Sequence, residues 1–240
     1  VRFVRFLYIV PTCVAILTAT LPRDLFAQSV PVRFRRLSVA DGLSQQVVNA
    51  IAQDQQGFLW FGTQDGLNRF DGYSFTAFHS TADNSAGLRN NSISRLLCTN
   101  DGKIWAGTID GGVSVYDPQK EIFTTYHHIP GDSSSLRTNN VAAIHQDRNG
   151  EMWIGVWNGG LSKMDTVAGK VRFVHYLHNP QDSSSLSDNL VSSMIEDREG
   201  NLWIGTWNGL NRMGPAGRVT RYFHSKSDFR TLGGNIVWSL

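Results

Sequence analysis

Cysteine is scarce, since the 240 residues contain only Cys13 and Cys98. Cys13 lies in an apolar N-terminal run, so a chain without this run would keep one thiol and could form no internal disulfide. Cys98 falls in a run that we interpret as a strand, and no base is evident beside it. We therefore expect Cys98 to be a small buried residue, and the fold to depend on packing.

The chain also has almost no net charge. The 22 Lys and Arg residues against 20 Asp and Glu residues give a net charge of +2. Arg2, Arg5, Arg23 and Asp24, all near the N-terminus, account for this difference by themselves. The rest of the chain is neutral and lacks the basic footprint of a protein that binds nucleic acid or an anionic membrane. We expect no nucleic-acid partner.

Patterns of metal ligands and catalytic groups are absent too. Asp54, Asp147 and Asp197 begin turns, but the spacing around them is not that of a calcium loop. Histidines follow an aromatic residue that recurs along the chain, at His79, His127, His178 and His224. Equivalent positions of a repeat diverge in space, whereas the ligands of one metal must converge. We expect no metal, no cofactor and no catalytic residue in this chain.

Long hydrophobic runs are missing except near the N-terminus. The apolar stretch 6–21 follows two arginines and is interrupted by Pro11, which makes it a poor candidate for a membrane-spanning helix. Residues 25–27 then offer a small-residue cleavage site. We expect residues 1–27 to be a signal peptide, or alternatively an uncleaved anchor, and the chain to be exported.

What the sequence does contain is one phrase repeated four times. Its tryptophans are Trp60, Trp105, Trp153 and Trp203, which are 45, 48 and 50 residues apart. A glycine follows two positions later in each copy, at Gly62, Gly107, Gly155 and Gly205. A fixed period of this length predicts a repeat architecture. A tryptophan filled in every copy is typical of packing between neighbouring sheets, and the glycine of close sheet approach.

Each period reads as four short strands. In the third copy the strands are expected at residues 141–146, 152–156, 161–164 and 171–176, separated by Gly- and Asn-rich turns. No segment shows helical periodicity. The sequence therefore predicts an all-β fold, a β-propeller built of four-stranded antiparallel blades, with a β-solenoid as the structural rival.

The two ends of the chain extend this reading. Residues 32–37 match the fourth strand of a blade, and 235–240 match the beginning of a first strand. We therefore expect a stray outer strand at Phe34–Leu37, followed by four blades present as an incomplete arc. Residues 28–240 would form the N-terminal part of a propeller, truncated in a fifth blade.

One face of such a propeller carries the candidate ligand site. Turns between the second and third strands emerge on the same side as the loops between blades, around the central channel. Expected on this face are Trp157, Asn158, Trp207, Asn208, Asp110, Asn139, Asn140 and Asn189. Aromatic rings beside amides suit a neutral polar ligand such as a sugar. The alternative is that these are only the turn residues of the repeat.

The phrase at residues 200–212, Gly-x-Leu-Trp-Ile-Gly-Thr-x-x-Gly-Leu-Asn-Arg, resembles the two-component regulator propeller repeat, and residues 41–46 and 57–73 resemble its first copy. The resemblance covers residues 33–240. It implies the sensor region of a bacterial signalling protein, on the periplasmic side of the inner membrane. In that family the propellers precede an immunoglobulin-like domain, a membrane helix and a histidine kinase or diguanylate cyclase, and several members respond to carbohydrates.

The partners that the resemblance implies are a small polar or oligosaccharide ligand, the remaining blades and a membrane-linked output domain, with a possible homodimer of the full-length protein. Two other functions stay open. One is a protein-interaction scaffold. The other is an exported glycosidase or lyase, although the Asp-x-x-Gly-x-x-Trp turns are one residue longer than sialidase Asp-boxes and no paired carboxylates stand out. We expect a non-catalytic sensor.

Overall fold

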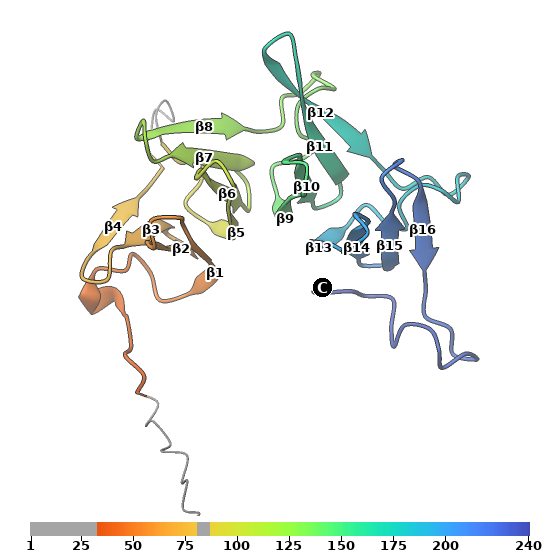
Figure 1. Cartoon of the computed structure of the whole chain (residues 1–240), viewed down its shortest axis with the longest axis horizontal. Coiled ribbons are helices and arrows are strands. Elements are labelled where there is room, and N and C mark those ends of the chain that lie inside the picture. Colours follow the sequence, from red (N-terminus) through yellow and green to blue (C-terminus); the bar gives the residue numbers. More distant parts are fainter. Residues whose placement is uncertain (1–32, 81–86) are drawn as a thin grey trace, which may run out of the picture. The chain divides into compact units, whose positions relative to one another are not determined.

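The computed structural model describes residues 33–80 and 87–240 (Figure 1). The chain divides into two units, Val1–Arg36 and Leu37–Leu240. In the first unit the described residues, 33–36, are exposed and form no strand. The predicted strand at Phe34–Leu37 is therefore wrong, because a strand needs a paired neighbour and none of the described strands pairs with this segment. The expected signal peptide, residues 1–27, lies outside the described residues.

The second unit is built of four-stranded antiparallel sheets, called blades 1 to 4 in chain order, after a short 3-10 turn η1 (Val39–Asp41). Blade 1 contains β1 (Val48–Gln53), β2 (Leu59–Thr63), β3 (Gly66–Phe70) and β4 (Phe75–Phe78). Blade 2 contains β5 (Ile93–Cys98), β6 (Ile104–Thr108), β7 (Val113–Asp117) and β8 (Ile122–Tyr126). Blade 3 contains β9 (Val141–Gln146), β10 (Met152–Val156), β11 (Gly160–Val167) and β12 (Lys170–Tyr176). Blade 4 contains β13 (Val191–Glu196), β14 (Leu202–Thr206), β15 (Gly209–Met213) and β16 (Val219–Tyr222).

This order confirms the predicted all-β fold of propeller blades. In each blade the strands pair in sequence order, and among the described residues no strand pairing closes the first blade onto the fourth. One strand is longer than expected: β11 runs on to Val167, where Ala168 and Gly169 turn the chain with positive φ values of 50° and 77°.

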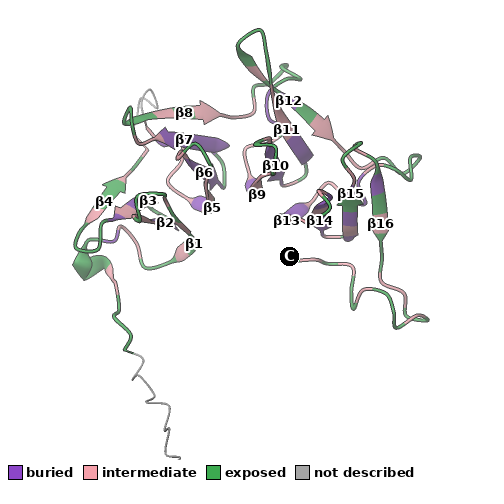
Figure 2. Cartoon of the chain, viewed as in Figure 1, coloured by how far each residue is buried: buried purple, intermediate pink, exposed green. Residues whose placement is uncertain are grey.

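The hydrophobic cores lie between consecutive blades. The second strands are buried almost throughout, whereas the fourth strands are more exposed (Figure 2). Trp60 of blade 1 clusters with Ile93 and Ile104 of blade 2. The same arrangement recurs between blades 2 and 3 and between blades 3 and 4, so each blade buries one face against the next. Packing between sheets thus stabilises the described part of the chain, in which Cys98 is a free thiol.

The repeated glycines lie where neighbouring blades come closest. A Cβ at Gly155 would come within 2.5 Å of Val191 Cγ1 in the next blade, and one at Gly107 within 2.6 Å of Val141 Cγ1. Gly205 faces Val237 in the same way, at 2.8 Å. No larger residue fits at these points without moving the neighbouring sheet.

Residues 235–240 follow the path of a further first strand without being a regular strand. The Val237 amide donates to the Thr206 carbonyl at 3.0 Å, and Ser192 Oγ donates to the Val237 carbonyl. Two other blades repeat the side-chain bond, since Asn49 Nδ2 reaches Ile93 O and Ser94 Oγ reaches Val141 O. In blade 3 the equivalent residue is Ala142, which has no donor.

Candidate functional site

The turns between the first and second strands are held by an aspartate. In blade 1 Asp54 Oδ1 accepts the amides of Gln56 and Phe58, and Asp54 Oδ2 accepts the indole N–H of Trp60 at 2.8 Å. Asp147 and Asp197 bond the tryptophans of blades 3 and 4 in the same way, at 3.0 and 2.8 Å. The expected turn aspartates therefore also satisfy the buried indoles, which the sequence analysis did not foresee.

Asp197 shows what these bonds do to the carboxylate. Desolvation alone would raise the pKa of Asp197. Hydrogen bonds from the Asn201 side chain and amide and from the Trp203 indole outweigh this effect and hold the pKa well below its usual range. The ionised form is the one that accepts these bonds, so Asp197 stays charged at neutral pH.

Blade 2 departs from this pattern. Thr99 stands where the other blades have aspartate, and its hydroxyl donates to the Lys103 carbonyl at 3.1 Å. The indole Nε1 of Trp105 is buried and has no partner, and the Trp105 side chain as a whole is 5% exposed. Since an unpaired buried donor costs free energy, the turn of blade 2 holds its tryptophan less favourably than the corresponding turns of the other three blades do.

The loops between blades share a fixed design. The amide of His128 donates to Asn139 Oδ1 at 2.7 Å, and His178 and Asn189 repeat this bond at the same distance. The ring Nδ1 of His128 donates to the Leu136 carbonyl at 2.8 Å, and the Leu136 side chain is fully buried. The side-chain oxygens of Asn139 and Asn189 are thus already used within their loops. The recurring His…Leu…Asn spacing was the sequence signal for this role.

The structure brings the two turn tryptophans together. The ring centroids of Trp157 and Trp207 lie 5.0 Å apart at an angle of 69°, and both side chains are half-buried. Trp238, which the sequence analysis did not single out, packs on Trp207 at 5.3 Å and is 66% exposed. These three residues, which we call the indole row, link blade 3, blade 4 and the segment after blade 4.

Four other expected site residues are Asn140, Asn158, Asn208 and Asp110, and the first of them contacts the indole row. The amide of Trp157 donates to the Asn140 carbonyl at 2.9 Å, which places Asn140 next to the row. Asn158 and Asn208 follow the tryptophans and are exposed, with Asn158 at a positive φ of 58°. Asp110 is exposed in the corresponding turn of blade 2, where Ile109 replaces the tryptophan.

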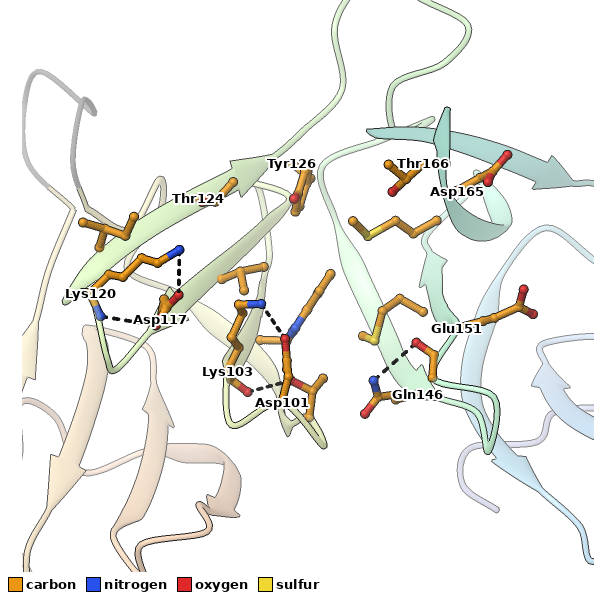
Figure 3. Close-up of a pocket in the computed structure, with 17 residues that line it drawn as sticks. Asp101, Lys103, Asp117, Lys120, Thr124, Tyr126, Gln146, Glu151, Asp165 and Thr166 are labelled. Atoms are coloured by element: carbon orange, nitrogen blue, oxygen red, sulfur yellow. Dashed lines mark hydrogen bonds and ion pairs between the residues drawn. The ribbon is translucent and has the colours of Figure 1, made fainter. Parts of the chain in front are cut away.

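A separate cavity, of about 510 Å³, opens between blades 2 and 3 (Figure 3). Its walls include Lys103 and Asp101 from the turn before β6, and Gln146 and Glu151 from blade 3. These residues belong to turns between first and second strands, which emerge on the side of a blade opposite to the indole row. Sequence reasoning missed the cavity because two different blades form it.

Several other expectations can be placed in the structure. Within residues 33–80 and 87–240 no three His, Cys, Asp or Glu side chains cluster as a metal site would require. Cys98 is half-buried against the core between blades 1 and 2, and burial raises the pKa of its thiol. In the described part of the chain, no helix combines the length and apolar character needed to cross a membrane.

Known proteins match this repeat. The two component regulator propeller family matches residues 42–65, 87–110, 135–158 and 185–208. A histidine kinase P4 of Formosa agariphila is 41% identical over 73 residues, which is 30% of this chain and 5% of that protein.

Solved structures agree. The extracellular domain of a putative hybrid two component system from B. thetaiotaomicron superposes with a TM-score of 0.70 at 29% identity, over 79% of this chain and 26% of that chain. Virginiamycin B lyase from Staphylococcus aureus has a TM-score of 0.52 at 17% identity over 75% of this chain and 56% of its own, which shows the fold alone. The chain thus spans about a quarter of the matching extracellular domain. It is built of two-component regulator propeller repeats.

Proposed function

We propose that this chain is part of the exported sensor region of a two-component signalling protein, and that it binds a neutral polar ligand, of the carbohydrate class, at the indole row. The observation that carries the proposal is the contact series Trp157–Trp207–Trp238 on the turn side of blades 3 and 4. The likeness to the extracellular domain of a hybrid two component system supports the signalling context.

The surroundings of the indole row suit an uncharged ligand. Tryptophan rings cover the apolar face of a sugar, and nearby amides can bond its hydroxyl groups. The side-chain amides of Asn140, Asn158 and Asn208 make no hydrogen bond within the described residues, in contrast to those of Asn139 and Asn189. We therefore assign ligand contacts to the first three amides and loop support to the other two.

Signalling requires two conformational states. A ligand shifts an equilibrium only by binding one state better than the other. Because the indole row joins blades 3 and 4 to the segment that follows, a ligand lying across it would favour one relative position of these elements. The proposed output is a histidine kinase or diguanylate cyclase in the membrane-anchored parent protein, on the far side of the inner membrane.

Calorimetric titration of the complete exported region with neutral oligosaccharides tests the ligand claim. Trp207→Ala removes the central ring and should weaken binding about tenfold, the effect of one aromatic contact. Asn208→Ala should weaken binding without disturbing the fold, because the residue is exposed. Phe229→Ala is the matched control, since Phe229 is 97% exposed and belongs to the segment that follows β16. Absence of heat with every sugar, or equal affinity in all variants, would refute the assignment.

A further inference from the structure

We propose that the cavity between blades 2 and 3 is a second binding site, which takes an uncharged molecule of the size of a mono- or disaccharide. This site is independent of the indole row and goes beyond the function proposed above. Its volume of about 510 Å³ lies in the range of small-molecule sites, about 300–1,000 Å³.

The charges around the cavity are already neutralised by one another. Each carboxylate that lines it forms an ion pair with a lysine or arginine of the chain, namely Asp101–Lys103, Asp117–Lys120, Glu151–Lys163 and Asp165–Arg172. Lys103 and Lys120, the cations lining the cavity, are members of these pairs (Figure 3). A charged ligand would have to break a pair or be desolvated without a counter-charge, so the site favours a neutral one.

Three hydroxyl groups of the lining, in contrast, are unused, whereas that of Thr99 is already bonded to its own turn. Thr124 and Tyr126 lie two residues apart on β8, so their side chains point to the same side of the strand, and Thr166 faces them from β11 (Figure 3). None of these three hydroxyls makes a hydrogen bond within the described residues. They offer donors and acceptors to a ligand's own hydroxyls.

The wall behind these hydroxyls is apolar. Met152 is buried, and Met164 and Trp105 extend the apolar lining. The Tyr126 ring stacks on Trp105 at a centroid distance of 6.0 Å, and burial raises the pKa of the Tyr126 hydroxyl, which keeps it a neutral donor. An apolar wall edged by hydroxyls matches a sugar ring, which has apolar faces and a polar rim.

In the corresponding cavity between blades 3 and 4, a long side chain takes up part of the groove. It measures about 380 Å³, and Arg148 crosses it to bond Glu196 and the carbonyls of Asp197 and Arg198. Blade 2 has Asn100 at the position of Arg148, and only its backbone amide reaches across, to Gln146 Oε1 at 2.8 Å. The cavity between blades 2 and 3 therefore keeps more space for a ligand than its neighbour does.

The methyl resonances of the methionines report which cavity a sugar enters, because different methionines line the two cavities. Four methionines occur, of which Met152 and Met164 line the proposed site, Met213 lines the neighbouring cavity and Met194 lines neither. The full chain carrying ¹³C-methyl methionine is titrated with glucose, N-acetylglucosamine and maltose, and with the charged analogues glucosamine and glucuronate. We expect saturable shifts at Met152 and Met164 with at least one neutral sugar, and at least tenfold weaker binding of its charged analogue. No saturable shift with any neutral sugar, or equal shifts at Met213, would overturn the proposal.

Substitutions in and outside the cavity test whether the shifts arise from binding there. Thr124→Trp fills the cavity and should abolish the shifts, whereas Thr76→Trp, at the equivalent exposed position of blade 1, should leave them intact. Tyr126→Phe keeps the ring and should weaken binding several-fold, while Tyr176→Phe in the neighbouring cavity should not. Unchanged Met194 and Met213 resonances show that the Thr124, Thr76 and Tyr126 variants fold. For Tyr176→Phe, which packs in the same core cluster as Met194 and Met213, the ligand-free Met152 and Met164 resonances report folding instead.

Trp207→Ala separates the two proposals. It should leave the Met152 and Met164 shifts at wild-type values even though it weakens binding at the indole row. Loss of both signals in this variant would mean that the cavity is no separate site.

Discussion

Supplying the missing carboxylate in blade 2 should stabilise the protein. Thr99→Asp places an acceptor opposite the indole N–H of Trp105, as Asp147 does for Trp153 in blade 3 at 3.0 Å. It also offers an oxygen to the amides of the turn, which Asp147 bonds at 2.9 Å. The substitution thus rebuilds in blade 2 an arrangement that the other three blades already contain.

The expected change in the free energy of unfolding follows from the groups involved. An unsatisfied buried donor costs about 1–3 kcal/mol, and this cost is what the new carboxylate removes. Against it stand the hydroxyl bond from Thr99 to the Lys103 carbonyl and the proximity of a second carboxylate, Asp101. Lys103 pairs with Asp101 and reduces that repulsion. We expect a net gain of about 1–2 kcal/mol, which for a domain of this size raises Tm by roughly 2–8 °C.

Thermal and urea denaturation followed by tryptophan fluorescence measure the effect. Thr99→Asn keeps an acceptor without the charge and should recover part of the gain, which separates hydrogen bonding from repulsion. The mirror variant Asp147→Thr, which imposes the blade 2 sequence on blade 3, should lower Tm. If Thr99→Asp is destabilising while Thr99→Asn is neutral, the reasoning about the unpaired indole is refuted.

Three further predictions concern the blade contacts and the response to acid. Gly155→Ala should destabilise the protein by about 1–3 kcal/mol through overpacking, whereas Gly233→Ala, which meets open space, should be nearly neutral in the same urea titration. Ala142→Ser should add the missing bond between blades 3 and 4 and raise the free energy of unfolding by about 0.5–1.5 kcal/mol, and no gain would contradict that bond. Burial lowers the pKa of His145, so the unfolded chain takes up a proton more readily than the folded one. Stability should therefore fall as pH drops below about 6.5, and His145→Gln should flatten this part of a stability-versus-pH profile.

Much of the fold could be predicted from the sequence because the same strand and turn pattern occurs four times. The Trp-x-Gly phrase marks the second strand of each blade, and Gly-rich turns mark the hairpins on either side. The strand predicted at Phe34–Leu37 was wrong. The segment has the sequence pattern of a fourth strand, but the described residues contain no strand that pairs with it. A sequence pattern reports which side chains could be buried, but not whether a partner is present.

The candidate site was harder to predict from the sequence, because the role of its residues depends on contacts with other parts of the fold. Asn139 and Asn189 look like surface amides in sequence, yet their oxygens hold the loop backbone at His128 and His178. Trp238 was overlooked because its role depends on reaching Trp207 in the preceding blade. The free volume between two blades likewise depends on which long side chain crosses the groove. The sequence of a single repeat does not show which side chain that is.

The most direct test of the account is the output of the full-length parent protein in membranes. Its kinase or cyclase rate is measured across a titration of the sugar that the exported region binds, for wild type and for Asn208→Ala. The account predicts a ligand-dependent change in rate, shifted to higher sugar concentration in the variant by the same factor as its affinity. A rate that stays constant while the ligand saturates the exported region would contradict the sensor function.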